Sequence, residues 1–335
     1  MTVTQQRAIP TVDISPYLAG TDEGKRAVAE AVDAACRSVG FLIITGHGVD
    51  PALVQEMRDV SFEFFRLPED EKLRVKMPSD RYRGYTSPGS ESLAASYGME
   101  APPDLKESFS IGPCDPPDDE YHSPAKAGAF FAANIWPERP DGMRPTWSRF
   151  YGEMERLATD LMRVFALALG LDEHFFDDKV DEHITNFSAI HYPPLTREPL
   201  PGQLRGGPHT DFGSLTIVHR DQAPGGLQVL VGDEWVDAPW VDDSFVVNLG
   251  DLMSEWTNDR WVSTVHRVAL PPTLHDGQSD RLVFTFFHQP NYDAAIEVLP
   301  TCCSEEDPPR YADTTSGTHI TRKVLAMRSP ELGAP

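Results

Sequence analysis

Residues 206–218 read GGPHTDFGSLTIV, and this stretch decides the fold that the sequence predicts. Its second half, SLTIV, is a short run with β-branched residues, which favours a β-strand. Further short runs of this kind follow Asn186, namely NFSAIHY, GLQVLV, SFVVNL, STVHRVAL and RLVFTFF. Turn sequences such as PGG, GDE and PPTLHDG separate them. Many short strands joined by turns predict a sandwich, barrel or jelly roll.

The chain before these strands is richer in helices. Residues 22–39 have apolar side chains at helical spacing, and a second helix is expected from Asp50 or Pro51 through VQEMRDVSFEFFRL. Residues 77–144 are rich in Pro, Gly and Ser, which is typical of loops draped over a core. A long amphipathic helix is expected over residues 145–169.

The sequence therefore predicts an α+β protein with a jelly-roll core and a helical N-terminal part packed around it. Residues 1–144 are expected to form a helix-rich N-terminal region with loops on the substrate side. Residues 145–335 are expected to form the long helix and the jelly-roll core, and both parts are expected to make one compact unit.

The charge balance excludes several kinds of partner. The 335 residues include 29 Lys and Arg against 52 Asp and Glu, a formal net charge of −23. Nucleic acids and anionic membranes are bound by clustered cations, so neither is expected as a partner, and no protein partner is indicated. No apolar stretch could span a bilayer, and the start lacks an apolar signal core, so a cytoplasmic location is expected. The four cysteines show no CxxC spacing and are expected to be reduced.

His209 and Asp211 stand two residues apart at the start of an expected strand. Side chains two apart on a strand point to the same side, so an imidazole and a carboxylate face one point. A third ligand from another strand would complete the set, and His266, in WVSTVHRVAL, is a candidate, although a lone histidine on a strand is more often a core or surface residue. Two histidines and one carboxylate leave coordination positions open, which is the arrangement of non-heme Fe(II) sites.

A second HxD sequence, His219 to Asp221, lies nearby. It comes at the end of its strand and leads into QAPGG, so its side chains are expected to meet solvent rather than a metal. The first copy is preferred because it precedes the apolar run and follows two glycines, which let other groups approach closely.

The strand RLVFTFF begins with Arg281. Inside a barrel this arginine would be a buried cation that needs an anion. Phe286 and Phe287 alternate on the strand, so one is expected to face the cavity. Arg83 and Tyr85, in the loop RGYTS, are candidate substrate contacts. Asn248, after SFVV, is expected to stabilise a turn.

Seven segments in order resemble the isopenicillin N synthase-like branch of the 2-oxoglutarate and Fe(II)-dependent oxygenases. They cover nearly the whole chain and are IPTVDIS (9–15), GFLIITGHGV (40–49), DLKESFSIG (104–112), HYPP (191–194), HTDFGSLTIV (209–218), NLGDLMSEWTNDRWVSTVHRV (248–268) and RLVFTFFHQPNYDA (281–294). The resemblance implies a double-stranded β-helix that holds Fe(II) through the two histidines and the aspartate named above.

By the same resemblance, Arg281 matches the basic residue that binds the distal carboxylate of 2-oxoglutarate, and Tyr192 matches a tyrosine of that pocket. The chain departs from the pattern at two positions. Val283 replaces a serine that often helps to hold this carboxylate, and Ile190 replaces an asparagine of plant members. Thr285 is the hydroxyl expected to take over from the missing serine.

The implied activity is oxidation of an unactivated C–H bond of a small metabolite, by hydroxylation, desaturation or ring formation, in specialised metabolism. Fe(II), 2-oxoglutarate and dioxygen are consumed or bound, succinate and CO2 are released, and ascorbate supports the activity. Three alternatives stay open at this point. They are an isopenicillin N synthase-type oxidase that needs no 2-oxoglutarate, a zinc hydrolase, and a jelly roll that binds a ligand without catalysis.

Overall fold

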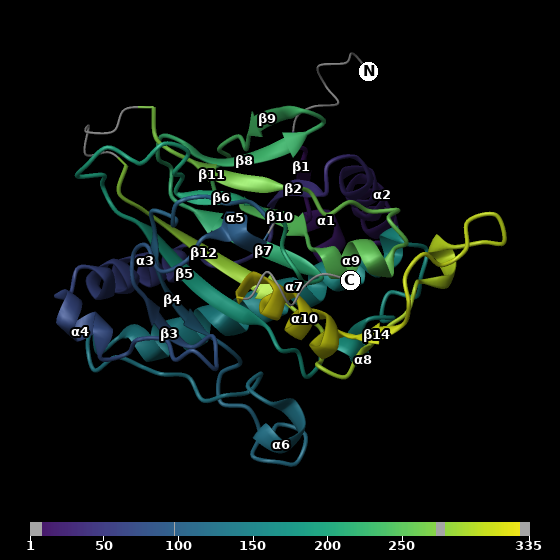
Figure 1. Ribbon diagram of the computed structural model, residues 1–335. Coiled ribbons are helices and arrows are strands. Elements are labelled where there is room, and N and C mark those ends of the chain that lie inside the picture. Colours follow the sequence, from purple (N-terminus) through teal and green to yellow (C-terminus); the bar gives the residue numbers. More distant parts are fainter. Residues whose placement is uncertain (1–8, 97, 273–278, 329–335) are drawn as a thin grey trace.

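Two β-sheets face each other in the protein. The computed structural model describes residues 9–96, 98–272 and 279–328 (Figure 1). The larger sheet has eight strands, in the spatial order β1 (Thr11–Asp13), β2 (Phe41–Thr45), β10 (Phe245–Leu249), β7 (Leu215–Arg220), β12 (Arg281–His288), β5 (Asn186–Tyr192), β4 (Glu107–Ile111) and β3 (Gly84–Thr86). β1 and β2 run parallel, and the remaining neighbours in this sheet are antiparallel.

The smaller sheet contains β6 (Gly206–His209), β11 (His266–Ala269), β8 (Gly226–Val231) and β9 (Glu234–Asp237), in this order. A cluster of apolar side chains joins the two sheets, with Phe41 and Val246 from the larger sheet and Val229 from the smaller one. β13 (Ala295–Ile296) and β14 (Thr314–Thr315) form a separate pair. The expected jelly-roll core in an α+β protein is confirmed.

The helices lie outside the sheets. They are α1 (Ser15–Leu18), α2 (Asp22–Ser38), α3 (Pro51–Phe65), α4 (Glu69–Leu73), α5 (Leu93–Ser96), α6 (Pro124–Ala127), α7 (Met143–Ala168), α8 (Asp177–Val180), α9 (Asp251–Trp256) and α10 (Ser316–Arg328), with a 3-10 turn at Pro300–Cys302. The three long helices expected from the sequence are α2, α3 and α7. No helix in the described ranges is both long and apolar enough to cross a membrane.

Helix ends follow local chemistry. The Thr21 hydroxyl accepts the Gly24 amide at 3.1 Å and caps α2, and Gly40 after that helix has a φ of +67°. The Asp50 carboxylate accepts the Ala52 amide at 2.8 Å, and Pro51 is the first residue of α3.

The N-terminal region also contributes to the sheet. β1 and β2 lie at one edge of the larger sheet, and β4 and β3 lie at the other. The short strand β3 falls where the sequence indicated a loop, because its three residues are too few for an alternating pattern to show.

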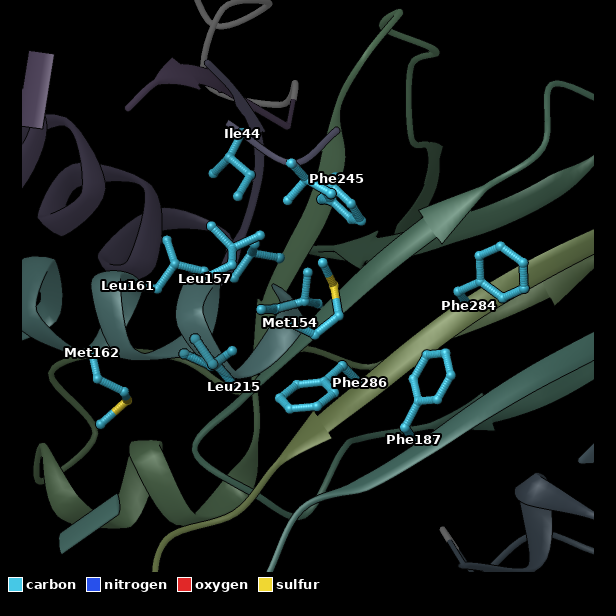
Figure 2. Packing of buried hydrophobic residues seen from close by; sticks show 14 of the residues in the cluster. Ile44, Met154, Leu157, Leu161, Met162, Phe187, Leu215, Phe245, Phe284 and Phe286 are labelled. Carbon is cyan, nitrogen blue, oxygen red and sulfur yellow. The ribbon is translucent and has the colours of Figure 1, made fainter. Parts of the chain in front are cut away.

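The outer face of the larger sheet packs against α7. Figure 2 shows Met154 and Leu157 of α7 next to Leu215, Phe286 and Phe187 of the strands. Side chains alternate along a strand, so the outward position of Phe286 places its neighbours on the other face. The inner face of β12, which looks toward the smaller sheet, therefore has four side chains, from Arg281, Val283, Thr285 and Phe287.

Candidate active site

The structure brings His209, Asp211 and His266 together between the two sheets. His209 ends β6 and His266 begins β11, and the two residues are direct partners in the antiparallel register. Their ring centroids are 4.2 Å apart. One ligand atom from each of the three residues lies within 4.8 Å of the others. Within the described ranges this is the only cluster of its kind.

Backbone carbonyls fix both imidazole rings. Nδ1 of His209 lies 2.8 Å from the Gly207 carbonyl oxygen, and Nδ1 of His266 lies 3.1 Å from that of Thr264. Since a carbonyl can only accept, each Nδ1 is the protonated nitrogen. Each Nε2 is therefore left with a lone pair that faces the carboxylate and could bind a metal.

The Asp211 carboxylate has one engaged oxygen and one open oxygen. Oδ2 accepts the Thr216 hydroxyl at 2.6 Å and the Asn248 amide at 2.7 Å. Oδ1 lies 3.8 Å from Nε2 of His209 and 3.9 Å from Nε2 of His266. The two hydrogen bonds orient the carboxylate so that Oδ1 points at the same place as the imidazoles.

Burial sets the protonation states. Burial, together with the nearby His266, lowers the pKa of His209 to about 3. Burial alone would raise the pKa of Asp211, but the two histidines and the hydrogen bonds from Asn248 and Thr216 hold it below its usual value. Neutral imidazole and ionised carboxylate are the forms that ligate metals, so the donor set fits Fe(II).

Arg281 lies on the same inner face as Thr216 and is 4 % exposed. It is the strand partner of Tyr192, and its guanidinium carbon lies 5.1 Å from the centroid of that ring. Nη1 donates to the Gly225 carbonyl at 3.2 Å, while Nε has no acceptor within the described residues. The chain passes close by at Gly226, where an added Cβ would lie 2.6 Å from Nη1. The site thus holds a buried cation that has no ion pair with any of the described residues.

Thr285 and Val283 occupy the inner face between Arg281 and Phe287. Thr285 is buried and pairs with Ser188 and Val218 in the neighbouring strands. It stands on β12 between Arg281 and Phe287, and Phe287 pairs with Thr216, whose hydroxyl donates to Asp211.

The four residues that the sequence indicated as substrate contacts lie on different faces of the larger sheet. Phe287 lies on the inner face and Phe286 on the outer one, as the alternation predicted. Arg83 is buried and donates to the Asn186 side chain at 3.1 Å, near the metal end of the sheet. Tyr85 points the other way, and its hydroxyl donates to Glu107 at 2.5 Å.

The second HxD sequence has structural roles. The His219 ring stacks on Phe284, with centroids 5.8 Å apart, on the outer face of the sheet. The expectation that Asp221 meets solvent is wrong, because its side chain is only 12 % exposed. Its carboxylate accepts the Leu282 amide at 3.0 Å and the Arg58 guanidinium at 2.9 Å, which fixes the start of β12.

Sequence reasoning missed two residues of the site. Asn248 was assigned to a turn, but its amide holds Asp211. Arg205 was not singled out, yet it is fully buried and lies beside Tyr192. Spacing gave no usable signal for Arg205, because the register between β6 and β11 shifts between Gly206 and His209, and simple alternation therefore does not relate Arg205 to His209.

A jelly roll with two histidines, a carboxylate and a buried arginine defines the class of non-heme Fe(II) oxygenases that use a 2-oxo acid. Residues 9–139 match the N-terminal region of the non-haem dioxygenases of morphine synthesis, and residues 183–290 match the 2OG-Fe(II) oxygenase superfamily. The chain belongs to that superfamily and is a 2-oxoglutarate-dependent dioxygenase that uses Fe(II).

Relatives of named activity span nearly the whole chain. Validamycin A dioxygenase of Streptomyces hygroscopicus subsp. limoneus is 33 % identical over 326 residues, 96 % of this chain and 87 % of the relative. The homoarginine-6-hydroxylase 2-ODD-233 of Oryza sativa subsp. japonica is 32 % identical over 335 residues, 95 % and 97 % of the two chains.

A solved structure shows the same fold with its cosubstrate. A full-length Neurospora crassa protein, crystallised in complex with alpha-KG and thymine, superposes with a TM-score of 0.82 and 32 % identity, covering 96 % of this chain and 97 % of that one. The comparisons confirm the 2-oxoglutarate-dependent activity over the oxidase, zinc hydrolase and non-catalytic alternatives.

Proposed function

We propose that His209, Asp211 and His266 hold the Fe(II), and that Arg281 and Tyr192 hold the distal carboxylate of 2-oxoglutarate, with Thr285 as the supporting hydroxyl. Two observations carry this assignment. Three ligand atoms converge within 4.8 Å between the two sheets, and the buried guanidinium of Arg281, on the inner face of the larger sheet, has an Nε atom without an acceptor among the described residues.

Bound Fe(II) and 2-oxoglutarate supply the oxidising power, as 2-oxoglutarate and dioxygen are converted to succinate and CO2. The protein's residues do the positioning. Thr216 and Asn248 keep Asp211 turned toward the histidines, and Arg281 neutralises the far end of the cosubstrate. Asp211, His266 and Arg281 are buried between the sheets, and the low local dielectric strengthens each of these interactions.

For the substrate, we propose a small molecule whose C–H bond undergoes hydroxylation, desaturation or ring formation in specialised metabolism. Validamycin A, homoarginine and thymine, named for the relatives, support a small-molecule substrate. Phe287 and Arg83 are the substrate-side residues, since Phe286 and Tyr85 point to the outer face. In this division residues 1–144 supply the substrate-side loops and residues 145–335 supply the oxygenase core.

We also assign the enzyme to the cytoplasm, with neither nucleic acid nor membrane as partner. The four cysteines support a reducing compartment, because all of them are free thiols. The net charge of −23 supports the absence of polyanionic partners.

The test needs no knowledge of the substrate. Purified protein with Fe(II), ascorbate, oxygen and 2-oxoglutarate should release succinate slowly. Without oxygen, 2-oxoglutarate should give the Fe(II) protein a weak visible charge-transfer band. Arg281→Ala should diminish both signals strongly, because a buried carboxylate that loses its cation costs on the order of 3–5 kcal/mol.

Val283→Ser is the matched control. It restores the commoner hydroxyl near Arg281 and should preserve or tighten 2-oxoglutarate binding. Iron-loaded wild-type protein that shows neither band nor succinate would refute the assignment of the pocket, and Arg281 would then be a candidate for binding a substrate carboxylate.

A further inference from the structure

Arg205 is a second buried arginine, and its guanidinium group lies beside Tyr192, as that of Arg281 does. It directly precedes β6, and its amide donates to the Val268 carbonyl at 3.2 Å. The side chain is fully buried, and its Nη2 donates to the Pro193 carbonyl at 3.1 Å. Nε and Nη1 have no acceptor in the part of the chain that the structure describes. Two donor nitrogens of a buried cation are thus left without a partner, which is costly unless an anion binds there.

Arg205 and Arg281 share one aromatic neighbour. Their guanidinium carbons lie 5.6 Å and 5.1 Å from the centroid of the Tyr192 ring. Nε of Arg281 also lacks an acceptor within the described residues. Burial and repulsion by Arg281 lower the pKa of Arg205 to about 10, and the side chain stays charged at neutral pH. The two cations come from opposite sheets and repel each other. An anion bound by both guanidinium groups would offset this repulsion.

Carboxylates near this end are already engaged. Asp280 accepts from His191 at 2.7 Å, and Asp104 accepts the amides of Leu93 and Gly207, each at 2.9 Å. Within the described ranges no ion pair is formed by Arg205. Among the described residues, no carboxylate therefore provides the counter-charge.

Several other cations of the described residues do have acceptors. Lys72 donates to Glu107 at 2.7 Å, and Lys106 lies 3.3 Å from a Glu91 oxygen. Arg220, on the inner face beside Val283, donates to the carbonyls of Ala238 and Pro239. Nε of Arg83 and Nε of Arg260 also lack an acceptor among the described residues, but Arg205 lacks one at two nitrogens, Nε and Nη1.

The wall next to Arg281 lacks the usual second donor. Val283 stands where a serine hydroxyl often assists, and its partner across the strands, Ile190, is also aliphatic. We propose that Arg205 supplies a second cation here, so that Arg205 and Arg281 bind the distal carboxylate of 2-oxoglutarate together, with Thr285 as the supporting hydroxyl. This inference rests on the proposed function, because it concerns the same cosubstrate in the same pocket.

The test compares two ligands that differ at the far end only. 2-Oxopentanoate keeps the 2-oxo acid of 2-oxoglutarate but has a methyl group in place of the distal carboxylate. Dissociation constants are measured without oxygen, from the charge-transfer band of the Fe(II) protein and by calorimetry with Mn(II) in its place. Arg205→Met should weaken 2-oxoglutarate binding about 10- to 100-fold, the loss of one to two charge-assisted hydrogen bonds, and leave 2-oxopentanoate binding within about twofold.

Two further variants separate charge from geometry. Arg205→Lys keeps the charge but not the planar pair of donors, so 2-oxoglutarate binding should fall between wild type and Arg205→Met. Arg220→Met removes a neighbouring guanidinium whose donors are satisfied by carbonyls, and the ratio of the two dissociation constants should stay near that of the wild type. If Arg205→Met does not fold, the lysine variant alone provides the comparison.

Each possible result of these binding measurements leads to a different conclusion. An unchanged ratio in the folded Arg205 variants would overturn the inference and leave Arg281 as the only cation on the carboxylate. Equal weakening of both ligands would also overturn it and make Arg205 a structural residue. Wild-type protein that binds neither ligand would instead contradict the proposed pocket as a whole.

Discussion

Both histidines of the metal centre are held through the same ring atom. In each case Nδ1 donates to the carbonyl two residues earlier in the chain, at Gly207 for His209 and at Thr264 for His266. Because this bond is local, the backbone conformation at each strand end sets the tautomer before the metal binds. A metal bound at the proposed site would thus meet preoriented Nε2 atoms, which would lower the ordering cost of binding.

The two HxD sequences give the first prediction at this scale. Replacement of His209, Asp211 or His266 by Ala should abolish turnover and sharply weaken iron binding, because each removes one of three ligand atoms. His219→Ala and Asp221→Ala should keep iron, since these side chains face β12 and Phe284 on the outer side. Iron content of the purified variants decides the matter. Loss of iron from the His219 or Asp221 variant with the fold intact would reverse the assignment.

Asn248 gives the second prediction at the residue scale. Its amide is one of two donors to Asp211 Oδ2, so Asn248→Ala should leave the carboxylate free to rotate and weaken iron binding about 10- to 100-fold. Asn134→Ala is the matched control, because the Asn134 side chain forms its hydrogen bonds with the backbone of Gly112 and not with Asp211. Iron titrations of both variants, with thermal unfolding as a check on the fold, test this. Equal iron affinities in the two variants would refute the role.

At the scale of elements, the sequence predicted what depends on period and local spacing. The strand runs after Asn186, the helix α7 and the inward alternation of β12 were all accessible in this way. Contacts across strands were not, because the sequence does not say that β10 lies next to β7, which brings Asn248 to Asp211. For the same reason Tyr85 was expected near the substrate, although its place on β3 turns it toward Glu107.

The packing of α7 against the larger sheet gives an element-scale prediction. Leu157 is 0 % exposed and lies among the apolar side chains of the outer face (Figure 2). Leu157→Ala should lower the free energy of unfolding by about 2–5 kcal/mol, the range for a cavity left by a buried leucine. Glu153→Ala, one turn earlier on the exposed side, should change it by about 0.5 kcal/mol or less. Urea unfolding measures both, and similar effects would contradict the packing described.

On the scale of the whole molecule, a buried polar network joins the N-terminal region to the jelly roll. The ring of His191, on β5, bonds the Glu107 carboxylate of β4 and the Asp280 carboxylate before β12, each at 2.7 Å. Glu107 also accepts from Lys72 of α4 and Tyr85 of β3. The network links α4, the edge strands β3 and β4, and the start of β12. Arg281, the first residue of β12, is thereby connected to residues far away in the sequence.

This network predicts how stability depends on pH. Burial alone would lower the pKa of His191, but the hydrogen bonds to Asp280 and Glu107 outweigh it, so the pKa is raised above the ordinary value of 6.5. A raised pKa in the folded state means that the protonated ring stabilises the fold fully below pH 6.5. That contribution is lost as the pH rises through the folded-state pKa, because the unfolded chain then binds fewer protons than the folded one.

His191→Asn should therefore lower the free energy of unfolding most at the acidic end and flatten its decline as the pH rises above 6.5. His174→Asn is the control, since that histidine is on the surface with its side chain 61 % exposed, and it should retain the wild-type slope. Urea unfolding at a series of pH values gives the slopes directly. If stability of the wild type rises above pH 6.5 relative to His191→Asn, the ring is neutral in the fold and the charged network that joins the two regions is wrong.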